Sequence, residues 1–178
     1  MPKVKIATEW LAGCAGCHMS LLDLDDKLVD LLRTIQITAS PITDLKHPPD
    51  VDVGIVEGAV ANTSNVEVLQ ELRRKCKVLL ALGDCACFGG IVTMRNFYKP
   101  EEVLRMGYVE TPSTEGGAIP SSDELARLLD RVLPVDRVVK VDCYVPGCPP
   151  SPAAIEWALK ELLAGRLPSP TGGYLRYD

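Results

Sequence analysis

Short apolar segments alternate with amphipathic segments along most of the chain, and this alternation is the feature that most restricts its fold. Five runs rich in Val, Ile, Leu and Ala predict strands at residues 3–9, 35–39, 51–57, 77–82 and 138–141. Apolar residues spaced three or four apart predict helices at residues 18–32, 66–76, 121–133 and 149–164. Because parallel strands need crossover connections, the pattern predicts an α/β fold, a flavodoxin-like doubly wound parallel sheet.

Seven cysteines stand out in a chain of 178 residues. They are Cys14, Cys17, Cys76, Cys85, Cys87, Cys143 and Cys148. In the predicted sheet, six of them follow the carboxyl ends of strands, and Cys76 alone lies at the opposite end. Loops at the carboxyl ends of parallel strands meet at one edge, where ligands bind. We therefore expect six thiols at this edge, together with Glu57, which ends the third strand.

Composition excludes several classes of protein. The chain is 47% apolar and 24% charged, which argues against intrinsic disorder, and its net charge of −5 argues against a general nucleic-acid binder. No apolar run is long enough to span a bilayer, so we expect no membrane association. The first residues lack a secretory signal and a twin arginine. We therefore expect a cytoplasmic protein, whose cysteines are thiols, metal ligands or redox pairs.

Thiols that converge from several loops indicate a metal centre. Four thiolates suit either tetrahedral zinc or an iron–sulfur cluster. One Cys-x-x-Cys pair, Cys14 and Cys17, is followed by Cys85 and Cys148 at separations of 68 and 63 residues, and this spread favours a cluster over zinc. The same pair also fits a thioredoxin-like redox motif, but that interpretation leaves the other cysteines at the edge without a role.

Four motifs resemble those of one known family. WLAGCAGCHMSLLD, at residues 10–23, is similar to the opening of the small, electron-transferring subunit of nickel–iron hydrogenases. VEGA at 56–59, LGDCACFGG at 82–90 and PGCPP at 146–150 match the family's other signatures in the same order. The resemblance covers about residues 3–165 and is closest to the short small subunit of cytoplasmic NAD-reducing (bidirectional) hydrogenases. Longer relatives add a region with two more clusters, so we expect one cluster here.

The resemblance implies specific ligands. Carried over position by position, the ligands of one [4Fe-4S] cluster fall on Cys14, Cys17, Cys85 and Cys148. The family's Gly-x-Cys-Ala-x-x-Gly-Gly frame selects Cys85 over Cys87. Cys87 and Cys143 then lie beside the cluster with no assigned role, and Cys76 is expected to be a buried small hydrophobe.

Three further residues are candidates for the surroundings of the cluster or for an interface. Glu57 is either a carboxylate that caps the next turn or a group near the cluster at the contact with the catalytic subunit. His18 either donates an N–H to a cluster sulfur or serves as a surface or helix-entry residue. Trp10 is expected to shield the cluster from water.

The resemblance implies that the chain carries electrons and is not catalytic alone. It is expected to act within a soluble hydrogen dehydrogenase, relaying electrons from a large nickel–iron subunit to a diaphorase that carries flavin and iron–sulfur clusters and reduces NAD⁺. The nickel–iron centre and NAD belong to those partners, and FMN on this chain is a further cofactor prediction. We expect one domain over residues 1–178, with an irregular insertion at 94–120 and a surface tail at 166–178 that supply subunit contacts.

Alternatives remain at this point. Small subunits of other cytoplasmic nickel–iron hydrogenases, which serve heterodisulfide reductase, a deazaflavin or sulfur compounds, share these motifs. The cluster-bearing subunit of respiratory complex I resembles the chain too, although it carries two adjacent cysteines where this chain has Cys-x-x-Cys. A zinc- or thiol-bearing binding module without redox function is the alternative from a different class.

Overall fold

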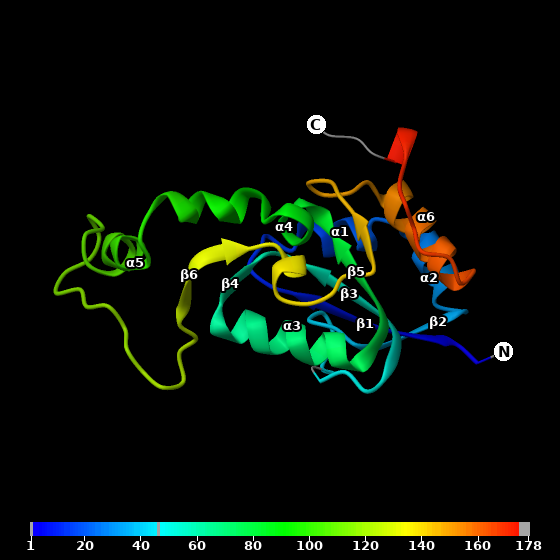
Figure 1. Cartoon of the computed structure of the whole chain (residues 1–178), viewed down its shortest axis with the longest axis horizontal. Coiled ribbons are helices and arrows are strands. Elements are labelled where there is room, and N and C mark those ends of the chain that lie inside the picture. Colours follow the sequence, from blue (N-terminus) through cyan, green and yellow to red (C-terminus); the bar gives the residue numbers. More distant parts are fainter. Residues whose placement is uncertain (1, 46, 175–178) are drawn as a thin grey trace.

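Five parallel strands form the central sheet (Figure 1). In a computed structural model that describes residues 2–45 and 47–174, the strands are β1 (Val4–Trp10), β2 (Ile35–Ala39), β3 (Val51–Glu57), β5 (Cys76–Leu82) and β7 (Cys143–Val145). Their order is β2-β1-β3-β5-β7, and every neighbouring pair is parallel. The predicted flavodoxin-like doubly wound sheet is confirmed.

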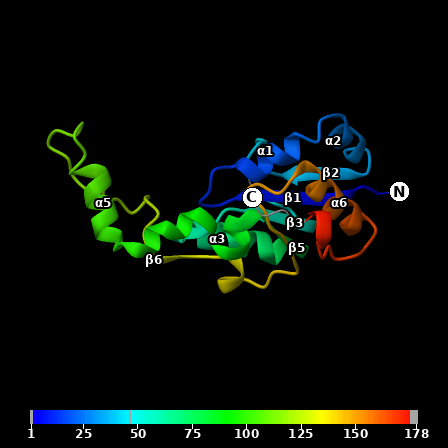
Figure 2. The ribbon, with the colours of Figure 1, turned by 90° about the horizontal axis from the view of Figure 1, so that it is seen from above.

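Helices cover both faces of this sheet, as Figure 2 shows for α1 and α2 on one side and α3 on the other. The first face carries α1 (Gly16–Leu22), α2 (Asp26–Leu31) and α6 (Pro152–Leu163), and the second carries α3 (Thr63–Lys75) and α4 (Gly83–Phe88). Successive strand residues point to opposite faces. Ile6 therefore belongs to the core beneath α1 and α6, whereas Ala7 belongs to the core beneath α3.

Local sequence signals set the ends of the long helices. The side chain of Asn62 accepts a hydrogen bond from the backbone N–H of Asn65 and caps α3. Ser151 caps α6 in the same way at Ala154, and Pro152 occupies the first turn, where its missing N–H costs little. The predicted helix over residues 18–32 is instead two helices, because the chain turns at Asp25, which has a φ of 49°.

A second, two-stranded sheet lies beside the first. β4 (Val60–Asn62) pairs antiparallel with β6 (Leu128–Leu133). The helix predicted over residues 121–133 is therefore wrong: residues 121–127 are irregular and residues 128–133 form β6. Leucine and valine recur there at a spacing that suits a helix, but Val132 packs against Ala59 and Ala61 only when the segment is extended beside β4.

The predicted strand at 138–141 is also wrong. A short helical turn, η2 (Val135–Arg137), precedes this segment, which stays irregular while its valines pack on the core. The ladder to β5 begins only where Asp142 N–H donates to the carbonyl of Leu79, so the fifth strand is β7.

Residues 90–127 form an arm that extends away from the central sheet in Figures 1 and 2. The arm begins with η1 (Gly90–Phe97) and α5 (Pro100–Tyr108), followed by a loop. The insertion expected at 94–120 is thus partly helical. At the other end of the chain, η3 (Gly172–Tyr174) brings Tyr174 onto Trp157 with ring centroids 4.9 Å apart. Residues 175–178 of the predicted tail lie outside the described residues.

No helix in the described part of the chain combines the length and the apolar character needed to cross a bilayer. The longest are α3 and α6, with 13 and 12 residues. Both are helices of ordinary globular length that cover the central sheet.

An ion pair joins the amino ends of the last two strands of the sheet. Nη1 of Arg73 lies 2.5 Å from Oδ2 of Asp142, and the same oxygen accepts the backbone N–H of Leu79 at 2.8 Å. Burial alone would raise the pKa of Asp142, but the bonds from Arg73 and Leu79 hold this pKa below its usual range.

We expect Asp142→Ala to lower the free energy of unfolding by about 2 kcal/mol near neutral pH, because a charge-assisted bond and a strand N–H both lose their acceptor. A depressed pKa stabilises the fold above the unfolded value of about 4 and stops doing so as the pH falls through the folded value. Urea unfolding should therefore show a difference from wild type that shrinks in acid. Asp30→Ala, in an exposed pair with Arg33, is the control; an equal loss there would contradict this account.

Candidate functional site

The segments that follow three strands meet at the carboxyl edge of the sheet, and they carry the four cysteines predicted as ligands. Cys14 and Cys17 follow β1, Cys85 follows β5 and Cys148 follows β7. Cys14 and Cys148 are exposed, whereas Cys17 and Cys85 are partly exposed. The remaining cysteines, Cys76, Cys87 and Cys143, are buried. Exposure therefore separates the four predicted ligands from the other three thiols.

The four thiols are close enough to influence one another's ionisation. Burial raises the pKa of Cys17 far above its ordinary value, and negative charge on Glu57, Cys14 and Cys85 adds to this effect. Burial likewise raises the pKa of Cys85, with further contributions from Cys148 and Cys14. These couplings connect all four thiols in one group, as the converging loops predict.

Glycine provides room beside two of the thiols. Gly83, the first residue of α4, has a φ of +84°, and a Cβ at this position would collide with Sγ of Cys17. Gly90 has a φ of +49°, and its Cβ would lie 2.8 Å from Sγ of Cys85. Because both positions need a left-handed backbone and free space, only glycine fits without strain. The two glycines thus leave room for the sulfurs of Cys17 and Cys85 themselves.

Backbone hydrogen bonds hold the first cysteine loop against the end of β3. Leu11 N–H donates to the carbonyl of Glu57 at 2.8 Å, and Ala12 and Ala59 exchange two bonds at 3.0 and 2.7 Å. These contacts continue the pairing of β1 with β3 past the end of both strands. The loop that carries Cys14 therefore starts from a rigid base.

Asp84 ties the second and third cysteine loops together. Its carboxylate accepts the N–H of Gly147 at 2.7 Å, and its own N–H donates to the carbonyl of Gly147 at 2.9 Å. Asp84 precedes Cys85, and Gly147 precedes Cys148. Two bonds between the neighbours of these cysteines thus fix the separation of their loops.

Glu57 is a buried carboxylate next to the cysteine pair. It is 2% exposed and accepts the backbone N–H of His18 at 2.7 Å. After the larger effect of burial, its negative charge also raises the pKa of the Cys17 thiol. A buried carboxylate needs a donor such as the N–H of His18 to offset its desolvation. Glu57 therefore holds the turn that enters α1.

His18 is the second buried polar group at this edge, with 1% of its surface exposed. Its Nε2 lies 3.0 Å from the hydroxyl of Thr8, which donates to the hydroxyl of Ser40 at 2.8 Å. Nδ1 lies 3.1 Å from a carboxylate oxygen of Glu57, without the angle of a hydrogen bond. His18 is thus no surface residue, and its ring nitrogens face Thr8 and Glu57.

Trp10 is 38% exposed and packs its ring edge-on against His18, with centroids 5.5 Å apart. It is the last residue of β1, before the loop that carries Cys14. The ring covers part of the buried histidine, and shielding of a cluster by Trp10 stays a prediction.

The three buried cysteines behave as small apolar residues that donate weakly to backbone carbonyls. The thiol of Cys87 faces the carbonyl of Ala81 at 3.6 Å, and that of Cys143 faces Leu79 at 3.9 Å. Burial raises the pKa of both thiols to about 12. Cys76 is buried where β5 begins and has a raised pKa for the same reason. All three stay protonated and inert near neutral pH.

No compact site for a single metal ion is formed by the cysteines of this edge, all of which lie within the described residues. Among residues 2–45 and 47–174, no three His, Cys, Asp or Glu side chains are grouped so that they could hold one metal ion. Zinc would need four ligands at about 2.0–2.3 Å from one centre. Cysteine thiolates also hold iron–sulfur clusters, and such a cluster stays a prediction for these four thiols.

Three residues of this edge are not predicted by the sequence patterns: Asp84, Thr8 and Ser40. Asp84 carried a usable signal, because Asp next to Gly in a loop is a common acceptor of backbone N–H groups. Thr8 lies in a strand and Ser40 just after one, and neither type of residue signals a buried network by itself. Their pairing depends on β1 lying beside β2, which only the fold shows.

A family model and several relatives match this chain. The model of the NADH ubiquinone oxidoreductase, 20 Kd subunit, covers residues 14–162. The NAD-reducing hydrogenase HoxS subunit delta of Cupriavidus necator is 38% identical over 97% of this chain and 86% of its own length. A vhu subunit of the F420-non-reducing hydrogenase of Methanocaldococcus jannaschii is 44% identical over 93% of this chain, which spans 58% of that relative.

Solved structures share the fold. A chain from the crystal structure of an NAD⁺-reducing nickel–iron hydrogenase in the H2-reduced state superposes with a TM-score of 0.96 at 41% identity, and 99% of this chain covers 100% of that one. A nickel–iron–selenium hydrogenase of Desulfomicrobium baculatum matches at 18% identity with a TM-score of 0.59, which shows a common fold.

We expect alkylation of the metal-free chain to divide the thiols by position. Cys14 and Cys148 should react first with iodoacetamide because they are exposed, whereas Cys17, Cys76, Cys87 and Cys143 should react slowly because burial raises their pKa values. Peptide mass spectrometry after timed quenching gives each rate, and urea-unfolded protein is the control in which the rates should converge. Fast labelling of Cys87 or Cys143 in the folded chain would contradict the structure.

Proposed function

The chain belongs to the family of the NADH ubiquinone oxidoreductase, 20 Kd subunit, and is a hydrogenase-type small subunit within it; on this premise we propose that it relays electrons from hydrogen oxidation to NAD⁺. It is a subunit of an oxidoreductase complex, and the chain alone is not expected to be catalytic. The relay would begin at a large subunit that oxidises H2 and end at a diaphorase that reduces NAD⁺.

The observation that carries this proposal is the group of four accessible cysteines at one sheet edge. We assign Cys14, Cys17, Cys85 and Cys148 as the ligands of one [4Fe-4S] cluster. Their exposure, their mutual electrostatic coupling and the close approach of Gly83 and Gly90 to the sulfurs of Cys17 and Cys85 support the assignment. When bound, such a cluster accepts and releases single electrons.

The other residues at the edge would position these ligands. Glu57 orients the turn that carries Cys17 through the backbone N–H of His18. Asp84 sets the distance between the loops of Cys85 and Cys148. Trp10 limits the access of water from the side of the first loop. Fixed ligands and restricted water are the means by which a protein tunes a cluster.

A contact with another subunit is supported by apolar side chains on the arm. Ile91, Met94, Phe97, Tyr98 and Met106 are all more than half exposed, and Phe97 reaches 84%. They lie on η1, on α5 and, for Tyr98, between the two, and η1 begins two residues after the helix of Cys85 ends. Exposed apolar groups in such number are typical of protein interfaces. We propose that the arm packs against a partner subunit near the cluster.

The other cofactors of the proposed complex would be held by its partner subunits. The nickel–iron centre would lie in the large subunit, and flavin, further clusters and the NAD site would lie in the diaphorase. Location in the cytoplasm follows from the same assembly. Bound FMN on this chain is a prediction that depends on the fold alone, and we assign no residues to it.

A second candidate differs only in the electron acceptor. The 44% identity to the vhu subunit of an F420-non-reducing hydrogenase favours an acceptor other than NAD⁺, although this chain spans only 58% of that relative and 86% of the HoxS subunit. The intact complex, purified under its native expression, separates the two. Under the main proposal it reduces NAD⁺ with H2, whereas reduction of artificial dyes but not of NAD⁺ would favour the second candidate.

We expect Cys85→Ser to abolish H2-dependent NAD⁺ reduction by the complex, because a hydroxyl replaces a soft thiolate ligand. Electron paramagnetic resonance of the reduced complex should show the loss or alteration of the cluster signal. The matched control is Cys76→Ser, a buried cysteine at the opposite end of β5, which should keep both the signal and the activity. Equal effects of the two substitutions would overturn the ligand assignment.

Phe97→Asp should weaken the association of the chain with its larger partner, since a charge would be buried in an apolar contact. Affinity purification from native expression, followed by gel analysis and nickel determination, measures how much large subunit stays bound. Val29→Asp, at a side chain 59% exposed on α2, adds the same charge elsewhere. Unchanged recovery with Phe97→Asp would show that the arm is not part of the interface.

A further inference from the structure

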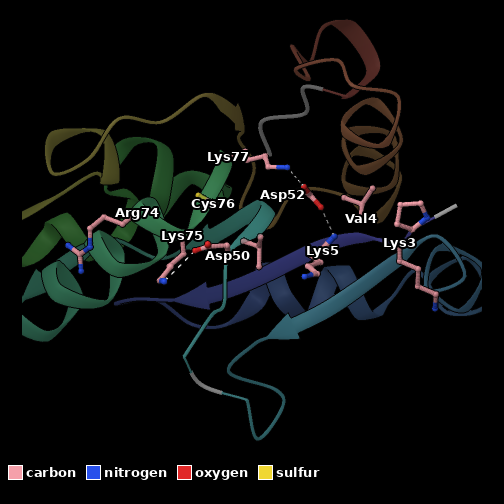
Figure 3. A pocket seen from close by; sticks show the side chains of 11 residues that line it. Lys3, Val4, Lys5, Asp50, Asp52, Arg74, Lys75, Cys76 and Lys77 are labelled. Atoms are coloured by element: carbon pink, nitrogen blue, oxygen red, sulfur yellow. Dashed lines mark hydrogen bonds and ion pairs between the residues drawn. The ribbon is translucent and has the colours of Figure 1, made fainter.

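The amino edge of the sheet, opposite the cysteines, carries an open cleft of about 720 Å³ (Figure 3). It lies where β1, β3 and β5 begin and where α3 ends. Its charged lining, here called the basic cleft, consists of Lys3, Lys5, Arg74, Lys75 and Lys77 with Asp50 and Asp52. The electron relay proposed above uses none of these residues.

Positive charge dominates this cleft in an otherwise acidic chain. The lining of the cleft contains five cationic side chains and two carboxylates, whereas the whole chain has a net charge of −5. All five cationic residues are exposed to solvent. A concentrated charge of the opposite sign to the rest of the surface marks a place for electrostatic recognition.

The carboxylates leave this positive charge only partly neutralised. Lys77 Nζ lies 2.7 Å from Asp52, and Lys75 Nζ lies 3.3 Å from Asp50, as the dashed lines in Figure 3 mark. The side chains of Lys77 and Asp50 are 79% and 89% exposed, so these pairs are weak and exchangeable. Partner carboxylates can replace them at little cost.

The backbone at this edge disfavours small phosphate ligands. Phosphate sites use N–H groups at helix N-termini, but α3 presents its carbonyl end here. Lys3 Nζ donates to the carbonyl of Leu32, just past α2, and Arg73 donates to the carbonyl of Cys76. What the edge offers an anion is exposed lysine and arginine side chains, which suit carboxylates dispersed over a protein surface.

We propose that the basic cleft docks an Asp/Glu-rich surface segment of another subunit of the same complex. This inference rests on the proposed function, because it presumes that the chain works in an assembly. β1, β3 and β5 run from the cleft to the cysteine edge, and each has seven residues. At the rise of an extended strand, this length separates the cleft from the cysteines by about 20 Å. The contact therefore speeds and orients assembly and carries no electrons.

The test is the rate at which the full chain associates with the remaining purified subunits at low and high salt. Lys5→Gln/Lys77→Gln should reduce the association rate roughly tenfold at low salt, and the difference from wild type should vanish at high salt, where screening removes steering. Lys27→Gln/Lys160→Gln is the matched control, because it removes two cations that both pair with Glu156 on another face. The net charge changes equally in both variants.

Two outcomes overturn the proposal: equal rates for the cleft variant and the control, or stronger binding of inorganic pyrophosphate than of a short polyglutamate peptide to the full chain. The second would identify a site for small anions instead. H2-dependent NAD⁺ reduction by the assembled complex is measured in parallel. If the cleft variant associates at the normal rate and the complex still reduces NAD⁺, the docking proposal fails but the proposed electron relay does not. If the wild-type chain does not assemble with the other subunits, the proposed function itself fails.

Discussion

The site depends on one constraint: parallel strands deliver their carboxyl ends to the same edge, and hydrogen bonds beyond those ends keep the loops there. β1, β5 and β7 bring cysteines that are far apart in sequence to one place. The two bonds between Asp84 and Gly147 then fix the loops of β5 and β7 relative to each other. The cysteines that we propose as cluster ligands are thus brought together by the sheet itself.

Burial gives the seven cysteines two different chemistries. Cys87 and Cys143 lie inside the apolar core, where a thiolate would be costly, and they remain neutral packing residues. Cys14 and Cys148 lie where solvent and partners reach them. Glu57 occupies the boundary between these environments, and its buried carboxylate is tolerated because the backbone N–H of His18 donates to it.

Periodicity and residue type correctly predicted the strands that depend on local sequence. They gave wrong predictions for segments whose secondary structure depends on contacts with distant parts of the chain. Residues 35–39 and 51–57 are strands with the predicted bounds, because continuous apolar runs suit a sheet covered on both faces. Residues 128–133 have a spacing that suits a helix, yet they pair with β4, a contact that no local pattern signals. The edge was predictable from the cysteines, but the bond from Gly147 to Asp84 joins residues 63 positions apart.

We propose different roles for the two edges of the sheet: electron transfer at the cysteine edge and docking of another subunit at the basic cleft. The cysteine edge carries the central claim, and metal analysis tests it most directly. Iron, acid-labile sulfide and zinc should be measured per chain in anaerobically isolated protein. The account predicts about four irons and four sulfides with no zinc. One zinc without sulfide would contradict it and would make the chain a structural metal-binding subunit.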